Sequence, residues 1–195
     1  MGKMLPLWNM VHEGQQDPVL DEGIYEFTVK RIVSLDENKS ITLAFDVNGR
    51  GIAACIPFDK EPYTVARCLL ASVGILKDFK SQWATSELAN TVGRKGRGLI
   101  DKYIADNGEE KNRFIAYIVP WADEDDFLWK YRVMKRANWK CEACGAHGTV
   151  AHHKKPKSVY PDEMYDVKNG QCLCEPCHNA WHDMYGTMAV GGPGL

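Results

Sequence analysis

The alternation of apolar and polar positions is strongest in the first half of the chain. Three segments there, 24–33, 41–47 and 51–56, are rich in β-branched and aromatic residues, which predicts strands. The second and third segments are joined by Asn48-Gly49. This pair is a strong hairpin signal because both residues tolerate the positive φ of a type I′ turn. We therefore expect an antiparallel hairpin centred on Asn48-Gly49.

A helix is predicted after the third strand. Pro62 suits the first turn of a helix, where its missing N–H costs nothing. Val65, Leu69, Val73 and Leu76 then recur at helical spacing and define one apolar stripe. We expect this stripe to cover one end or face of the sheet.

Two further strands are predicted at 98–105 and 113–119, on either side of Asn107-Gly108. The resulting order is three strands, a helix and two strands, which is the order of the OB-fold, a small and partly open barrel. The alternative is another small antiparallel sheet with one helix. The predicted fold class is α+β, beginning with an OB-like five-stranded barrel over 1–120.

The charge pattern changes after this first domain. Residues 121–126 include four consecutive acids, which favours an acidic linker or the start of a helix. A helix is predicted over 127–138. Between 127 and 160, eight Lys or Arg residues face one acid, an excess of seven in a chain whose net charge is −2. We expect a second domain over 127–185 and a disordered Gly-rich tail over 186–195.

Concentrated cations favour binding of a polyanion. The candidate nucleic-acid contacts are Arg94, Lys95, Arg97, Arg132, Lys135, Arg136, Lys154 and Lys155. Near the first three, Gly96 and Gly98 would let the backbone approach a phosphate chain closely. The barrel aromatics Tyr25, Phe45, Tyr103 and Tyr117 are interpreted as core residues in preference to base-stacking platforms.

Four of the seven cysteines form two Cys-x-x-Cys pairs, Cys141/Cys144 and Cys174/Cys177. Four thiolates in this spacing are the ligand set of structural zinc. Cys172 leaves a second register open, through Cys172-x-Cys174, but we interpret it as a buried spare thiol. Cys55 and Cys68 lie far from the pairs and are expected to be small buried side chains.

Five of the six histidines lie within residues 141–182, and four of these, His152, His153, His178 and His182, form a pattern that structural zinc does not need. His178 and His182 are spaced i, i+4, which places both rings on one face of a helix. His152 and His153 are adjacent on a predicted strand, so their side chains should point in opposite directions. One of them can then join a metal site with the helical pair, while its neighbour stays free to act as a general base. His147 is expected to bind no metal.

Residues 132–182 resemble the HNH, or ββα-metal, endonucleases in the branch that carries a four-cysteine zinc. The matching motifs are Arg132-x3-Arg136, Trp139-Lys140-Cys141-Glu142-x-Cys144-Gly145, Ala151-His152-His153-x-x-Pro156, Asn169, and Cys177-His178-x3-His182. The resemblance implies that His153 is the general base and that Asn169 orients the loop and the base. It implies that His152, His178 and His182 hold one catalytic divalent ion, in a zinc-stapled C-terminal ββα-metal module.

A second resemblance covers Leu20 to Val119. This half is similar to phage-encoded OB-like proteins that travel with recombination genes and bind single-stranded DNA. The shared features are the opening strand Gly23-Ile24-Tyr25-Glu26-Phe27, a helix ending near Gly74-Ile75-Leu76, and a basic turn leading into a final hairpin.

The HNH resemblance implies hydrolysis of DNA phosphodiester bonds with 5′-phosphate and 3′-hydroxyl products, and the OB-like resemblance implies an N-terminal domain that binds or positions DNA. Many HNH enzymes have Asp at the position of His152. Three neutral imidazoles favour Zn²⁺, Ni²⁺ or Mn²⁺ over Mg²⁺, which prefers oxygen ligands. The alternative function is a non-catalytic zinc-knuckle protein that binds nucleic acid. The expected partner is DNA, including single-stranded or branched DNA, while the sequence leaves the oligomeric state open.

The expected compartment is the cytoplasm of a bacterial or phage-infected cell. No apolar run approaches the ~18 residues that a membrane span needs. The first ten residues have none of the features of a secretory signal.

Overall fold

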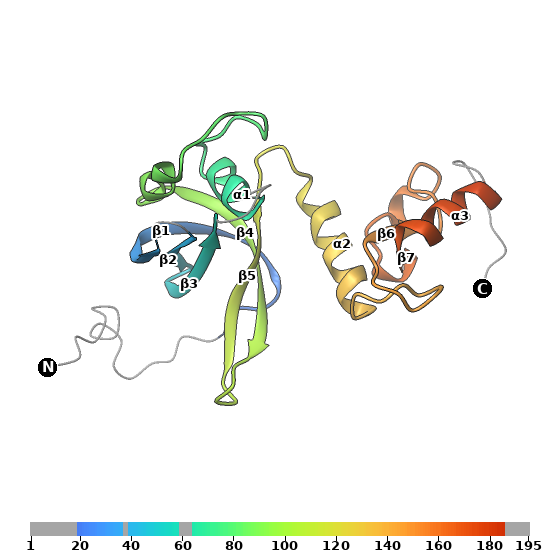
Figure 1. Cartoon of the computed structure of the whole chain (residues 1–195). Helices are drawn as coiled ribbons and strands as arrows, with labels where there is room; N and C mark the ends of the chain where they lie inside the picture. The colour runs from blue at the N-terminus through green and yellow to red at the C-terminus, as the bar shows by residue number, and fades with distance from the viewer. Residues whose placement is uncertain (1–18, 37–38, 59–63, 186–195) are drawn as a thin grey trace, which may run out of the picture. The chain divides into compact units, whose positions relative to one another are not determined.

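The computed structural model describes residues 19–36, 39–58 and 64–185, and the chain divides into two compact units between Ala122 and Asp123 (Figure 1). The expected tail over 186–195 and the expected helix start at Pro62 lie outside the described residues. Each unit has its own sheet and its own buried core.

Unit 1 is built on a nearly closed, barrel-like sheet of five antiparallel strands in the order β3-β2-β1-β4-β5 (Figure 1). The strands are β1 (Gly23–Asp36), β2 (Ser40–Val47), β3 (Arg50–Pro57), β4 (Lys95–Ile104) and β5 (Glu110–Ile118). β1 pairs with both β2 and β4, and the edge strands β3 and β5 contact each other. The sheet therefore curls around one core.

The hairpin between β2 and β3 turns at Asn48-Gly49, with positive φ values of 53° and 84°. These are the signs that a type I′ turn requires, so the sequence prediction is confirmed here. β2 alternates buried and half-buried positions, and its residues Ile41, Leu43 and Phe45 point into the core.

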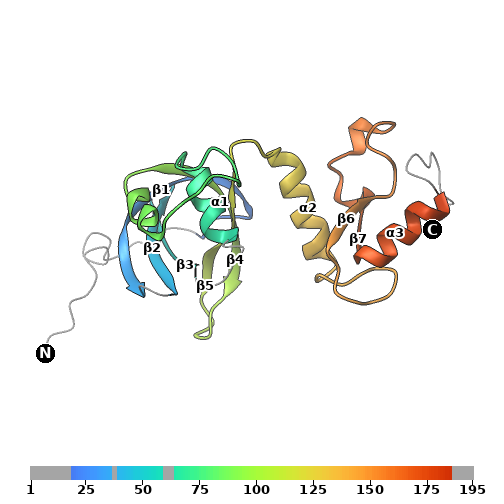
Figure 2. The ribbon, with the colours of Figure 1, turned by 45° about the horizontal axis from the view of Figure 1, so that its top comes forward.

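Helix α1 (Thr64–Ser72) packs against β3, β4 and β5, and the 3₁₀ helix η2 (Thr85–Thr91) lies against α1 (Figure 2). The predicted stripe is buried at Leu69, Val73 and Leu76, but α1 ends at Ser72, so Val73 and Leu76 enter the core from the turn after the helix. The prediction is wrong for Val65, which is 42% exposed, because Ala66 instead turns toward the core in the first turn.

The two glycines next to the basic turn serve internal packing. A side chain at Gly96 would collide with the Phe27 ring and with Ser72, and one at Gly98 would collide with the Phe114 ring. The absence of side chains thus makes room for the aromatic core. Packing of the aromatic core therefore explains why glycine occupies these two positions, without the predicted approach of a phosphate chain.

Unit 2 consists of α2 (Glu124–Arg136), the two-stranded sheet of β6 (Val150–His153) and β7 (Gly170–Leu173), and α3 (Glu175–Tyr185). Two 3₁₀ turns, η3 (Pro161–Glu163) and η4 (Val167–Asn169), lie between the strands. Helix α2 begins three residues before the predicted Phe127. Asp123 caps it by accepting from the Asp126 N–H at 3.1 Å, so part of the predicted acidic linker is the first helical turn.

The core of unit 2 is small. Trp129, Val133, Met134 and Cys172 form one buried cluster, and Leu173 packs with cysteines in another. A domain of this size buries little apolar surface and commonly needs a metal or disulfides. Within the described part of the chain, no helix is long and apolar enough to cross a membrane.

Candidate metal centres and their surroundings

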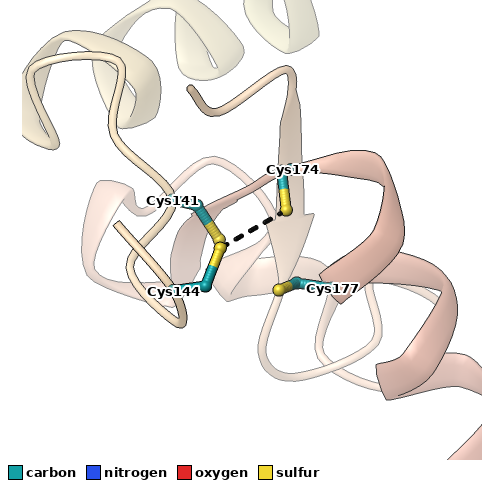
Figure 3. Close-up of side chains that lie close together, drawn as sticks. All are labelled: Cys141, Cys144, Cys174 and Cys177. Atoms are coloured by element: carbon teal, nitrogen blue, oxygen red, sulfur yellow. Dashed lines mark hydrogen bonds between the residues drawn. The ribbon is translucent and has the colours of Figure 1, made fainter. Parts of the chain in front are cut away.

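The four paired cysteines converge in unit 2 (Figure 3). Cys141 and Cys144 come from the loop after α2, Cys174 follows β7, and Cys177 lies in the first turn of α3. Their sulfur atoms all lie within 4.8 Å of one another, and Sγ of Cys144 is 3.7 Å from Sγ of Cys174. Tetrahedral zinc with ~2.3 Å bonds separates its sulfur ligands by about 3.8 Å. The four cysteines can hold a structural metal such as zinc.

Local backbone bonds shape the first knuckle. The N–H of Cys141 donates to the Ala146 carbonyl at 2.7 Å, and that of Gly145 donates to the Cys141 carbonyl at 2.8 Å. Gly145 has a φ of 78°, which glycine adopts without strain. The knuckle therefore closes by a tight turn that brings both sulfurs to the same side.

The pKa values of Cys141 and Cys177 are shifted in opposite directions. Burial raises the pKa of Cys141, but backbone N–H groups of Cys174, Cys144 and Ala143 outweigh burial and bring the pKa to about 6. Hydrogen bonds with the Cys174 and Cys144 side chains raise the pKa of Cys177 to about 12. Four adjacent thiolates repel one another, so all four ionise together only when a cation compensates their charge.

Cys172 lies outside this cluster. Its side chain is fully buried against Trp129, Val133 and Met134. The four cysteines placed to hold one metal ion are therefore Cys141, Cys144, Cys174 and Cys177. The expectation for the distant cysteines is wrong for Cys55, which is exposed, while Cys68 is half-buried.

Three histidines form a second cluster. His152 of β6 faces His178 and His182 of α3, and one ring nitrogen of each lies within 4.8 Å of the others. Nε2 of His178 and Nε2 of His182 are 3.1 Å apart. Two imidazoles on one tetrahedral ion with ~2.05 Å bonds have nitrogens about 3.3 Å apart. The spacing fits ligands to one ion.

His152 supplies the clearest sign of a missing partner. It is buried, and its Nε2 has no hydrogen-bond partner among the described residues. Burial, followed by the charges of His178 and His182, lowers the pKa of His152 to about 4. The imidazole is therefore neutral at pH 7, and a lone pair is available for a cation. The residues present fit a divalent ion.

His153 points the other way from β6. Its ring stacks on the Trp129 indole, with centroids 3.8 Å apart and planes 13° apart. Nε2 of His153 lies 2.8 Å from the Met164 carbonyl oxygen. Because a carbonyl only accepts, this contact favours the neutral tautomer with the proton on Nε2 and the lone pair on Nδ1. Sequence reasoning missed Trp129, because a buried helical tryptophan carries no signal of what it will stack on.

Asn169 ties together the ends of the loop between β6 and β7. Its side-chain oxygen accepts from the Lys155 N–H at 2.8 Å, and its amide donates to the Lys155 and Glu163 carbonyls at 3.2 Å. Asn169 is buried. The Glu163 carbonyl precedes Met164, so Asn169 fixes the segment whose carbonyl holds His153.

The predicted cationic residues differ in their surroundings. Arg136 is used inside unit 2, where it pairs with Glu142 at 2.9 Å and donates to the Val167 and Gly170 carbonyls. Glu142 in turn accepts from the Cys172 N–H at 2.7 Å. Arg136 thus stabilises the packing of unit 2 while its side chain stays partly exposed, and its contact with nucleic acid stays a prediction.

The other predicted cations of unit 2 are also exposed. Nζ of Lys154 donates to the Lys168 carbonyl at 3.2 Å, and Nζ of Lys155 pairs with Glu163 at 2.8 Å. Arg132 and Lys135 lie on the exposed surface of α2, and Nζ of Lys135 is 5.7 Å from the Tyr131 ring centre. His147 is exposed and lies outside the histidine cluster found among the described residues.

In unit 1, Lys95 pairs with Glu26 at 2.8 Å and Arg94 donates to the Asn90 carbonyl at 3.2 Å. Arg97 is exposed on β4. The aromatics Phe45 and Tyr117 are buried, and Tyr25 packs against the core. Tyr103 differs, since it is 37% exposed and Arg113 lies 5.5 Å from its ring centre. The core interpretation is therefore confirmed except for Tyr103.

The structure thus brings together the predicted ligands in two separate clusters on one small unit, with His153 and Asn169 beside the second. A comparison of the chain with protein-family models and with curated proteins found no match.

Proposed function

We propose that the chain is a metal-dependent endonuclease of the HNH type that hydrolyses DNA phosphodiester bonds. The main support for the proposal is that two adjacent histidines point in opposite directions into different surroundings. His152 faces His178 and His182, while His153 faces away and is held by Trp129 and the Met164 carbonyl. Metal-assisted hydrolysis needs a bound metal ion and a nearby base, and an oriented imidazole that does not bind the metal can serve as that base.

His152, His178 and His182 would hold the ion. When bound, a divalent ion supplies charge that polarises a phosphate and stabilises a leaving oxygen. His153 accepts the proton of the attacking water at Nδ1, since its Nε2–H is committed to Met164. Asn169 keeps that carbonyl in place through its bond to Glu163. Arg132, Lys135, Lys154 and Lys155 supply positive charge for the DNA backbone.

The order β6, β7, α3 supports assignment of residues 127–185 to the ββα-metal architecture, with the cysteine cluster as its staple. Three imidazoles suit Zn²⁺ or Ni²⁺ better than Mg²⁺. We accordingly expect the softer ions to support activity at lower concentration.

Unit 1 is proposed to be OB-like and to bind or position DNA, including single strands. Support comes from the strand order β3-β2-β1-β4-β5 and from the helix between β3 and β4. Arg94, Lys95 and Arg97 contribute the positive charge of this unit near the start of β4.

Incubation of the full chain with supercoiled plasmid and Mg²⁺, Mn²⁺, Ni²⁺ or Zn²⁺ tests the proposal. We expect conversion to nicked or linear plasmid only with an added ion, and ends that a ligase can rejoin, because they carry 5′-phosphate and 3′-hydroxyl groups. Plasmid that is bound in a mobility-shift assay but stays intact with every ion would support the alternative, a non-catalytic zinc-knuckle binder.

A further inference from the structure

The connection between α2 and the first cysteine knuckle has an unusual backbone. Asn138 and Trp139 both have positive φ, 49° and 58°. The left-handed region is unfavourable for a residue with a side chain, and a bulky aromatic residue there is a genuine outlier. The Trp139 N–H donates to the Met134 carbonyl at 3.0 Å, and the Trp139 carbonyl accepts from Gly148 at 2.9 Å. The N–H groups of Asn138 and Trp139 bond back to the Lys135 and Met134 carbonyls, which is the Schellman pattern that ends α2 and accounts for the positive φ of Asn138. The unusual residue is therefore Trp139, a bulky side chain in the left-handed region.

Burial does not account for this strain. The Trp139 side chain is 44% exposed. Its ring meets the Tyr131 ring edge-on, with centroids 6.2 Å apart and planes 62° apart. Tyr131 supports the indole from one side, and much of the indole remains accessible. Strained non-glycine residues that persist in native structures cluster at sites that clamp ligands.

The surroundings of Trp139 are cationic. Nζ of Lys135 lies 5.7 Å from the centre of the Tyr131 ring, which contacts the Trp139 indole. Exposed Lys140 follows Trp139 in the chain. Both belong to the stretch 127–160 with its excess of seven positive charges. A protein interface is typically depleted of lysine at its centre, whereas a nucleic acid offers phosphates for the lysines and a base for the indole.

We propose that Trp139 is a stacking platform for an unpaired base of a DNA substrate. The choice of DNA rests on the proposed nuclease function, and the inference narrows the substrate to DNA with a single-stranded segment beside the bound duplex. A base inside an intact duplex presents no free face to an indole, so blunt duplex gains nothing from Trp139.

Two glycine substitutions distinguish the effect of the indole ring on binding from the effect of the backbone conformation. Asn138→Gly and Trp139→Gly each remove a side chain from a positive-φ position, and only the second removes the indole. The full chain is titrated into a fluorescent duplex with a single-stranded overhang and into the blunt duplex, without added divalent ions. We expect Trp139→Gly to weaken overhang binding on the order of 10-fold, with blunt-duplex binding and salt dependence unchanged.

Asn138→Gly should bind both probes like the wild type. Equal weakening on both probes by Trp139→Gly, or no weakening on either, would overturn the proposal. A second measurement avoids substitutions altogether. Overhangs carrying 5-iodouracil are photo-crosslinked to the wild-type chain, and the crosslinked peptide is expected to contain Trp139.

Crosslinks found only at other residues would also overturn the proposal. These binding readouts are independent of cleavage. A chain that crosslinks through Trp139 but cuts nothing contradicts the nuclease function alone. A chain that nicks plasmid but shows no effect at Trp139 contradicts the stacking proposal alone.

Discussion

Replacement of Cys144 by serine is expected to unfold unit 2 while unit 1 stays folded. The small core around Trp129 and Val133 buries too little apolar surface to hold the unit alone. Structural zinc contributes about 10–16 kcal/mol of apparent binding free energy in zinc-finger peptides, which is comparable to the whole stability of about 5–15 kcal/mol of an ordinary domain. Loss of one thiolate removes most of that contribution.

The measurement is thermal unfolding followed by circular dichroism, together with limited proteolysis. Proteolysis should cut the variant within 139–182 and spare the barrel strands. Cys55→Ser is the matched control, because Cys55 is exposed and lies in unit 1, outside the cluster. A Cys144→Ser protein with native melting and normal protease resistance would show that the cysteines do not hold a structural metal.

Replacement of His182 by alanine is expected to remove one of two bound ions without unfolding the protein. His182 is only half-buried on α3, whereas the four cysteines lie on a separate cluster. Loss of a residue that only hydrogen-bonds to a metal ligand costs about 10–100-fold in metal affinity or activity. Loss of the ligand itself should therefore cost more. Cleavage should fall by more than about 100-fold at limiting metal concentration.

Metal content per chain, measured after dialysis against Zn²⁺, should fall from two ions to one in His182→Ala. His147→Ala is the control, since exposed His147 lies outside both clusters, and it should retain both ions and full activity. Two ions retained by His182→Ala, or a single ion in the wild type, would contradict the assignment of a second metal site.

Much of the arrangement could be predicted because its signals are local. Asn48-Gly49 specifies its own turn, and the Cys-x-x-Cys spacing brings two sulfurs together whatever the fold around them. The i, i+4 spacing of His178 and His182 likewise needs only a helix. Each of these predictions depends on a few consecutive residues.

Features that depend on tertiary packing could not be predicted in this way. The sequence does not show that Arg136 bonds to Glu142 of the following loop and to the carbonyls of Val167 in η4 and Gly170 in β7. Gly96 and Gly98 looked like a phosphate-binding turn, but their role comes from Phe27 and Phe114 on other strands. Nothing in the sequence places Trp129 against His153, because 23 residues lie between them in the chain.

The most direct test of the central claim is plasmid nicking by His153→Ala beside the wild type, each with the ion that best supports wild-type cleavage. Removal of a general base typically costs about 10²–10⁴-fold in rate. We predict a loss in that range, with unchanged affinity for plasmid and two bound metal ions, since His153 faces Trp129 and Met164 and not the three clustered histidines. Wild-type cleavage by His153→Ala, or inert wild-type and variant proteins that bind DNA equally well, would contradict the account.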